Sequence, residues 1–153
     1  MKVGRLAKAF GMNINYFSVR NYKKTQFLKF LSSLDYLSIH CPLNEKTKDL
    51  ITIKELKIMK KNMILINTAR GGIVNENDLT KALKQKIIAG AGIDVTTSEP
   101  PKKSHAYYSI LNEANFIWTP HTAWASNETL QEAINQLIKN INSFYKGRKR
   151  NLV

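Results

Sequence analysis

The sequence predicts an α/β fold, in which a doubly wound parallel sheet is followed by one long helix. Two observations lead to this prediction. Short apolar segments alternate along the chain with amphipathic ones, which is the pattern of parallel strands joined by helices. In addition, the segment 63–67 is almost uniformly apolar, as expected of a strand that is covered on both faces.

The first half of the chain opens in a helix, because Val3, Leu6 and Phe10 fall on one helical face. Thr52 and Glu55 form the pattern of a capping box, which predicts the start of another helix. The elements expected in this half are the opening helix with Gly11 at its C-terminal cap, a strand at 12–17, a helix at 25–33, a strand at 36–40 and a helix from the capping box to about residue 60.

The second half ends in the longest amphipathic segment of the chain. The elements expected here are a strand at 63–67, a helix that Asn75 or Asn77 can cap and that runs to Lys86, a strand at 87–95, a surface loop at 96–109, a strand at 116–119 and a long helix from Ser126. The apolar residues of the last helix recur at alternating steps of four and three: Leu130, Ile134, Leu137, Ile141 and Phe144. Such a stripe is more typical of a helix packed on its own protein than of a coiled coil.

Length and composition indicate a globular chain without a membrane segment. The 153 residues are 43% hydrophobic, which suffices for one domain, or a piece of a larger one, with an apolar core. No apolar run approaches the ~20 residues that cross a bilayer, and the N-terminus lacks the apolar stretch of a signal peptide. The single Cys41 cannot form an internal disulfide, which agrees with a reducing compartment. We therefore expect a cytoplasmic protein with no membrane partner.

The net charge of +13 raises the question of nucleic-acid binding, because clustered Lys and Arg are the footprint of phosphate contacts. The basic residues are scattered along the whole chain, however, and the dense clusters are short ones such as residues 146–150. We therefore expect a solvated Lys-rich surface and no nucleic-acid partner, with a basic nucleic-acid-binding protein as the weaker alternative.

Polar residues with a clear chemical use follow the predicted strands. Arg70 comes just after a buried strand, where open parallel sheets place their ligands, and its forked donors suit a carboxylate. Asp94 ends the next strand, Glu99 follows in the loop, and His121 comes after the last strand. The ends of parallel strands meet at one edge of a sheet, so we expect these four side chains to share a cleft. The Arg would then anchor the substrate carboxylate, the His would donate a proton, and the Glu would tune the His.

Six motifs, in their order and spacing, resemble the D-isomer-specific 2-hydroxyacid dehydrogenase family, from the first helix to the last residue. They are AKAFGM at 7–12, HCPLNEKT at 40–47, INTARGGIVNENDL at 66–79, AGAGIDV at 89–95, SEPP at 98–101 and TPHTAW at 119–124. The stretch TPHTAWAS is most similar to the glycerate dehydrogenase, or hydroxypyruvate reductase, branch. The phosphoglycerate branch tends to have smaller residues where Trp124 stands.

The resemblance implies an incomplete Rossmann-like fold and an oxidoreductase that transfers hydride between NAD(H) or NADP(H) and a small 2-keto or 2-hydroxy acid. Arg70 matches the family's substrate-binding arginine, Glu99 the glutamate that supports the catalytic histidine, and His121 the general acid/base. The cofactor-binding residues that we expect are Ser18, Arg20, Cys41, Pro42, Thr68, Ala69, Arg70, Asp94, His121 and Ala123. We expect no metal, and we expect a homodimer at full length.

Cofactor preference stays open at the end of the predicted second strand. NAD-preferring units usually carry an Asp or Glu there, which binds the ribose hydroxyls. Ser18 stands at that place, followed closely by Arg20. An acid would repel a 2′-phosphate, whereas Ser and Arg can accept one, so NADP(H) is as suitable as NAD(H).

The sequence also departs from the family, since it has neither the G-x-G-x-x-G turn nor the strand before it. We therefore expect residues 1–122 to form a partial NAD(P)-binding domain, and residues 123–153 to form a C-terminal helix that returns to a missing substrate domain. Much of the apolar stripe of that helix would then lose its packing partner. Alone, the chain should bind cofactor poorly, be marginally stable or self-associate, and have little or no dehydrogenase activity. A corepressor-like interaction protein with the same fold is the alternative, and the intact Arg, Glu and His argue against it.

Overall fold

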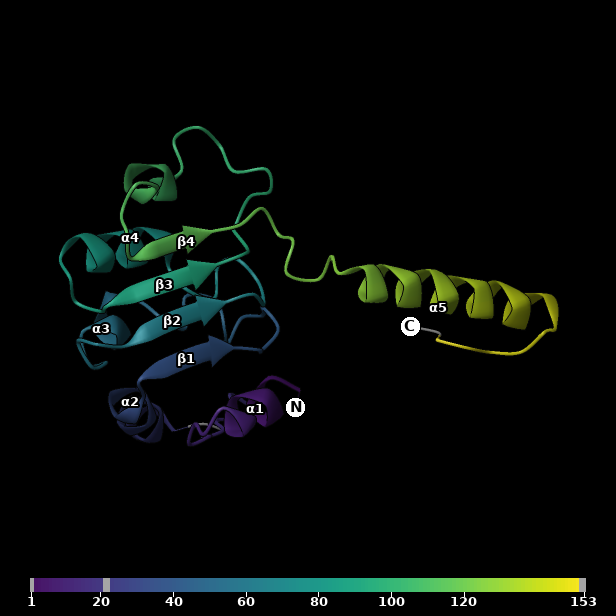
Figure 1. The fold of residues 1–153 in the computed structure, drawn as a ribbon, viewed down its shortest axis with the longest axis horizontal. Coiled ribbons are helices and arrows are strands. Elements are labelled where there is room, and N and C mark those ends of the chain that lie inside the picture. Colours follow the sequence, from purple (N-terminus) through teal and green to yellow (C-terminus); the bar gives the residue numbers. More distant parts are fainter. Residues whose placement is uncertain (1, 21–22, 152–153) are drawn as a thin grey trace.

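The computed structural model describes residues 2–20 and 23–151, and it contains a parallel sheet and one long helix that projects away from it (Figure 1). The four strands are β1 (Tyr36–Ile39), β2 (Ile64–Asn67), β3 (Gly90–Ile93) and β4 (Phe116–Trp118), paired in the order β1-β2-β3-β4. The helices are α1 (Lys2–Ala9), α2 (Lys24–Ser33), α3 (Ile53–Leu56), α4 (Glu76–Lys84), the 3-10 helix η1 (Ala106–Ile110) and α5 (Asn127–Tyr145). The predicted α/β fold with a parallel sheet and a long C-terminal helix is confirmed.

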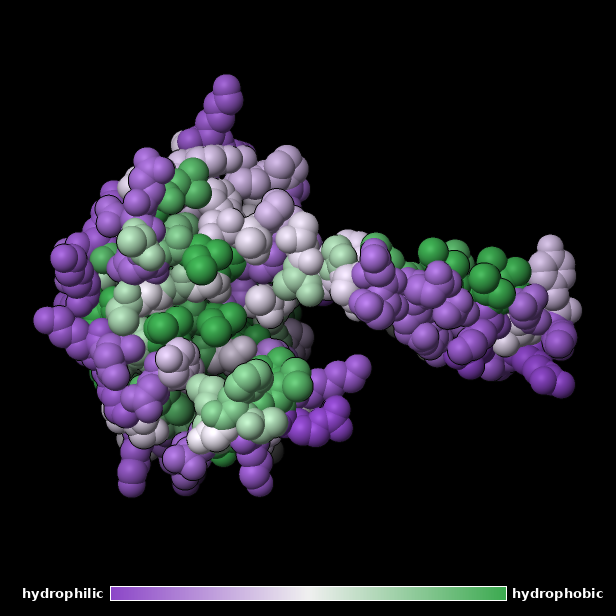
Figure 2. All heavy atoms as spheres, viewed as in Figure 1, coloured by the Kyte–Doolittle hydropathy of each residue, from purple (hydrophilic) through white to green (hydrophobic). Residues whose placement is uncertain are grey.

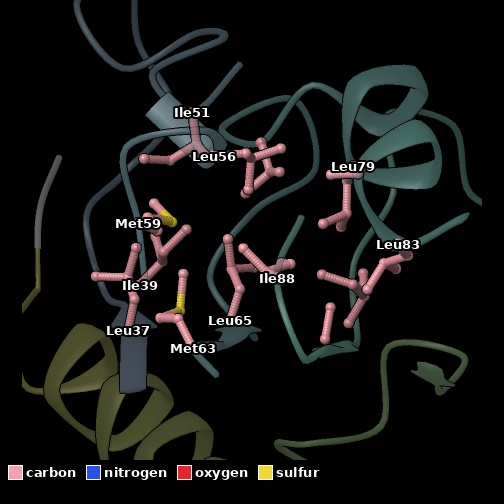
Figure 3. Close-up of a cluster of buried hydrophobic side chains, with 14 of the residues drawn as sticks. Leu37, Ile39, Ile51, Leu56, Met59, Met63, Leu65, Leu79, Leu83 and Ile88 are labelled. Carbon is pink, nitrogen blue, oxygen red and sulfur yellow. The ribbon is translucent and has the colours of Figure 1, made fainter. Parts of the chain in front are cut away.

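One face of the sheet carries the hydrophobic core. Leu37, Leu65 and Ala91 are paired across three neighbouring strands, and all three are buried. Parallel strands in sequential order, joined by right-handed crossovers, place their connecting helices on the same face. Accordingly, α3 contacts α4, and α4 contacts η1. Leu56 of α3 and Leu79 of α4 extend the core beyond the strands (Figure 3).

The opposite face of the sheet is only partly covered by the described residues. Tyr36 of β1 and Ile117 of β4 are 52% and 68% exposed. Ile64 and Ile66 of the inner strand β2 are half-buried. The strand predicted at 63–67 is therefore fully buried on one face and half covered on the other.

Local sequence signals predicted the helix starts well. The Thr52 hydroxyl and the Glu55 carboxylate form the expected capping box of α3. Asn75, rather than Asn77, caps α4 by accepting a hydrogen bond from the Asp78 N–H at 3.1 Å. Lengths were predicted less well. α3 ends at Leu56 rather than near residue 60, β3 is shorter than the predicted strand 87–95, and the predicted loop 96–109 contains the start of η1.

The strand predicted at 12–17 is wrong. These residues pair with no strand in the part of the chain that the structure describes. A strand requires a neighbour that takes up its backbone hydrogen bonds. In the strand order 3-2-1-4-5-6 that neighbour is the first strand, and no strand precedes β1 among the described residues. Phe17 instead packs its ring against Phe27 and Phe30 of α2, with centroids 5.3 and 5.0 Å away.

The long helix α5 is formed but not buried. Ser126 caps it by accepting a hydrogen bond from the Thr129 N–H at 3.2 Å. None of its residues is buried, and Figure 2 shows apolar side chains in a row along one side of it. The expectation that this stripe packs on its own protein is not met within the described residues. None of the described helices is long and apolar enough to cross a membrane.

Candidate active site

The carboxyl ends of the four parallel strands bring most of the predicted site residues to one edge of the sheet. Cys41 and Pro42 follow β1, Thr68 and Ala69 follow β2, and Asp94 follows β3 directly. The segment 119–123 follows β4 in the same way. This edge is the one at which open parallel sheets bind ligands.

A buried asparagine builds the turn that carries Arg70. The Asn67 side chain accepts a hydrogen bond from the Ala69 N–H at 3.1 Å and donates one to the Arg70 carbonyl at 3.0 Å. Arg70 itself is exposed, and its Nη1 donates to the Ala69 carbonyl at 2.7 Å. A Cβ atom at Gly71 would lie only 2.0 Å from the Thr96 carbonyl carbon, so this position admits no side chain. The Arg70 turn therefore packs tightly against the loop that carries Glu99.

Glu99 and His121 form a direct pair. The Glu99 Oε2 lies 2.6 Å from the His121 Nδ1, and its Oε1 accepts a hydrogen bond from the Thr96 N–H at 3.0 Å. These hydrogen bonds lower the pKa of Glu99 below its ordinary value, and the bond from the Thr96 backbone has a larger effect than the bond from the imidazole. The acid is therefore ionised at neutral pH, and it can only accept hydrogen bonds from the ring.

Asp94 organises the turn in which His121 stands. Its buried carboxylate accepts hydrogen bonds from the Thr119 hydroxyl and from the backbone N–H groups of Thr122 and Ala123, the latter two at 2.9 Å. Burial raises the pKa of Asp94, but these hydrogen bonds outweigh that effect and leave the pKa below its ordinary value. The carboxylate therefore stays charged while it holds the two ends of the turn together.

The backbone of His121 has a positive φ of 54°, which is uncommon outside glycine. The Trp124 indole N–H donates a hydrogen bond to the His121 carbonyl at 2.8 Å, and the His121 N–H bonds to the Thr119 carbonyl at 3.1 Å. These bonds, together with those to Asp94, keep the residue in this conformation. Thr119 and Trp124 were not predicted as site residues, because their contribution depends on contacts that sequence order does not reveal.

A pocket of about 330 Å³ lies at this edge, and it gathers several of the predicted residues. Its lining residues are Thr68, Arg70, Asp94, His121, Ala123 and Trp124. Glu99 does not line the pocket, but it reaches the site through its bond to His121. Cys41, Pro42 and Ala69 stand at the strand ends without lining it.

Ser18 and Arg20 lie outside this pocket. Both are exposed, and the Arg20 N–H bonds locally to the Ser18 hydroxyl at 3.4 Å. They follow the unpaired segment 12–17 rather than the end of a strand, so the sheet does not fix their position relative to the other site residues. Among the described residues, no group of His, Cys, Asp and Glu side chains is arranged to hold a metal ion.

The chain is similar to known proteins over nearly its whole length. The sequence pattern of the family described as D-isomer specific 2-hydroxyacid dehydrogenase, NAD binding domain, matches residues 1–123. The glycerate dehydrogenase of Methylorubrum extorquens is 42% identical over an alignment that covers 99% of this chain and 48% of the relative. The glyoxylate reductase of Thermococcus litoralis is 38% identical, with 95% of this chain and 45% of the relative covered.

A solved structure shows the same fold. The D-lactate dehydrogenase of Lactobacillus jensenii, crystallised with NAD+, superposes with a TM-score of 0.87 at 27% identity, covering 99% of this chain and 51% of that one. The chain thus spans about half the length of the relatives that it matches. Because the family pattern extends over most of the sequence and the sheet repeats the fold of a solved member, this chain belongs to the D-isomer specific 2-hydroxyacid dehydrogenases, through their NAD-binding domain.

Proposed function

We propose that this chain belongs to a dehydrogenase that interconverts a small 2-keto acid and a D-2-hydroxy acid. It would supply the binding site for the nicotinamide ring and the group that transfers the proton. The observation that carries this proposal is the close pair of Glu99 and His121, whose carboxylate and imidazole lie 2.6 Å apart, with His121 and Arg70 lining one pocket. Keto-acid reduction requires a positive group for the carboxylate and an acid for the developing alkoxide, and this pocket offers both.

Each of the three residues has one role. Among the described residues, the Arg70 guanidinium donates one hydrogen bond, to the Ala69 carbonyl, so the rest of its donor fork is offered to a substrate carboxylate. Glu99 holds the Nδ1–H of His121, which leaves the Nε2 atom to give a proton to the substrate oxygen or to take it back. A bound nicotinamide supplies or accepts the hydride.

The donor set at the strand ends suits the nicotinamide half of a dinucleotide. Asp94 uses three hydrogen bonds to hold the His121 turn, and a fourth lone pair of its carboxylate can accept one from a carboxamide N–H. Thr68 and Ala123 line the same pocket, and Cys41, Pro42 and Ala69 flank it. Ser18 and Arg20 are candidates for the ribose end, where they would accept either NAD(H) or NADP(H).

Hydroxypyruvate and glycerate are the first substrates to test. The relative with 42% identity is a glycerate dehydrogenase, and Trp124, which belongs to the stretch that resembles that branch, lines the pocket together with His121. A glyoxylate reductase and a D-lactate dehydrogenase match the chain as well, so the assay should compare the reduction of hydroxypyruvate, glyoxylate and pyruvate with NADH and with NADPH. We further propose that residues 1–122 form the cofactor domain and that 123–153 return to a substrate domain.

The test is a substitution of His121 in a chimera that joins this chain to the N-terminal half of the Methylorubrum extorquens glycerate dehydrogenase. We expect His121→Gln to lower kcat by roughly 10²-fold or more, the scale of a lost general acid. His40→Gln is the matched control, because His40 is exposed, bonds to Ser38 and does not line the pocket. Unchanged turnover by the His121 variant contradicts the proposed role.

A further inference from the structure

The loop that carries Glu99 is held to the sheet region by hydrogen bonds to a second carboxylate, that of Glu76. Glu76, the first residue of α4, accepts a hydrogen bond at Oε1 from the Thr97 N–H at 2.7 Å. Its Oε2 accepts two more at 2.8 Å, from the Thr97 hydroxyl and from the His105 Nε2. Three donors from both ends of one loop therefore converge on a single side chain.

The contacts of His105 identify which of its ring nitrogens donates and which accepts. Its Nδ1 accepts a hydrogen bond from the Tyr107 N–H at 3.3 Å, so this nitrogen carries no proton. Its Nε2 then carries the proton and donates to Glu76. The ring is 8% exposed and stacks on Trp118, with centroids 5.5 Å apart. The buried side chain of His105 thus holds one end of the loop through its hydrogen bond to Glu76, and it is not an exposed base.

The segment 96–104 has few other attachments. Among the described residues, its hydrogen bonds to other parts of the chain end on Glu76 and on His121, apart from a local backbone bond between Lys102 and His105. Packing comes from Gly71, whose missing side chain lets the Arg70 turn press on Thr96. Glu99 itself is 38% exposed and is not held by burial.

We propose that Glu76 is a positioning residue, which fixes the Glu99 loop so that the Glu99 carboxylate stays on the His121 Nδ1. Glu76 contacts neither substrate nor cofactor in this proposal and acts through Thr97 and His105. Its importance for catalysis rests on the proposed function, but its effect on the pair of Glu99 and His121 does not. Two residues separate Glu99 from Thr96, whose N–H bonds to the same carboxylate, so a displaced loop moves that carboxylate directly.

The test compares two acids in the first turn of the same helix. Glu76→Gln keeps the size of the side chain but leaves one acceptor oxygen for three donors. Asp78→Asn is the matched control, since Asp78 accepts the Ile53 N–H at 2.9 Å and so joins α4 to α3, away from the loop. Thr97→Val removes only the hydroxyl bond to Glu76 and keeps the volume, so it serves as the mild second variant.

The readout is the imidazole region of ¹H–¹⁵N spectra recorded on this chain, which has three histidines. The reference for a broken pair is Glu99→Gln. We expect the His121 signals of Glu76→Gln to move most of the way to that reference, those of Thr97→Val to move part of the way, and those of Asp78→Asn to stay unchanged. If Glu76→Gln fails to fold, Thr97→Val decides. Unchanged His121 signals in a folded Glu76→Gln, or in Thr97→Val where that variant decides, overturn the proposal.

Activity then separates this inference from the proposed function. In the chimera, we expect Glu76→Gln to lower kcat by up to about 10²-fold, as misplaced catalytic groups do, with little change in KM. A chimera without any dehydrogenase activity contradicts the proposed function alone, because the spectra report the pair of Glu99 and His121 independently. Equal losses of kcat in Glu76→Gln and Asp78→Asn contradict a specific role of Glu76.

Discussion

The sheet and the helix α5 carry equally clear apolar patterns, but they use them differently. Leu65 in the middle of the sheet is 0% exposed, whereas Leu137 on the stripe of α5 is 59% exposed. Leu65 lies in a strand predicted to be covered on both faces, whereas Leu137 lies on a stripe whose packing partner was expected in the missing substrate domain. Periodicity therefore determines which element forms and which of its faces is apolar, while burial depends on a packing partner that the period does not identify.

The N-terminal caps of the helices in the two regions, by contrast, are alike. Thr52 caps α3 inside the sheet region, and Ser126 caps α5 outside it, each with its side-chain oxygen on a backbone N–H. A cap needs only residues that are neighbours in sequence, so it forms whether or not the helix is packed. The two regions therefore share their local structure and differ in their tertiary contacts.

The largest effect should come from truncating the buried leucine. We expect Leu65→Ala to lower the free energy of unfolding by about 2–5 kcal/mol, because it removes a side chain from a closed core. Leu137→Ala should change it by less than about 0.5 kcal/mol, as an exposed substitution does. Urea unfolding followed by circular dichroism measures both. A comparable loss in the Leu137 variant means that α5 is packed in solution, which contradicts the contrast between the regions.

A smaller effect should come from Asp94, which secures the turn between the sheet and α5. Asp94→Asn should lower stability at pH 7 by about 1–3 kcal/mol, because the amide can no longer accept all three hydrogen bonds. Asp35→Asn is the matched control, since the side chain of Asp35 is 58% exposed and its pair with Lys60 should contribute less than about 1 kcal/mol. Urea midpoints at pH 7 compare the two variants.

The pH dependence follows from the lowered pKa of Asp94. A carboxyl group with a lower pKa in the folded state stabilises the fold above the pKa of the unfolded chain, and this contribution is lost as the pH falls through the folded pKa. The wild type should therefore lose stability on acidification below about pH 4. Asp94→Asn should show a shallower loss over the same range. An identical slope in both proteins contradicts this account of Asp94.

Much of the site could be predicted because the carboxyl ends of parallel strands lie together at one edge of the sheet. Arg70, Asp94 and His121 are each the first or nearly the first polar residue after a strand, so correct strand positions sufficed to bring them together. The pairing of Glu99 with His121 was expected from the family resemblance, and the structure has it at 2.6 Å.

The rest of the site depends on contacts between residues far apart in the sequence. Glu76 reaches His105 across 29 positions, and nothing in the residues around Glu76 distinguishes it from Asp78 as an ordinary acid of a helix start. The mistaken strand at 12–17 has the same cause, because its residues alternate suitably but no strand among the described residues lies beside them. Interactions of this kind become visible only once the tertiary structure is known.

The smallest effect should distinguish the two caps. Thr52→Ala should lower the free energy of unfolding of the sheet region by about 1 kcal/mol, because α3 is packed and its loss is coupled to the core. Ser126→Ala removes an equivalent hydrogen bond from α5, yet it should leave that unfolding transition unchanged and only reduce the helical signal. Amide hydrogen exchange separates the two outcomes. Faster exchange confined to α5 in the Ser126 variant means that α5 unfolds independently of the sheet. Faster exchange in β2 as well means that the sheet and α5 unfold as one unit.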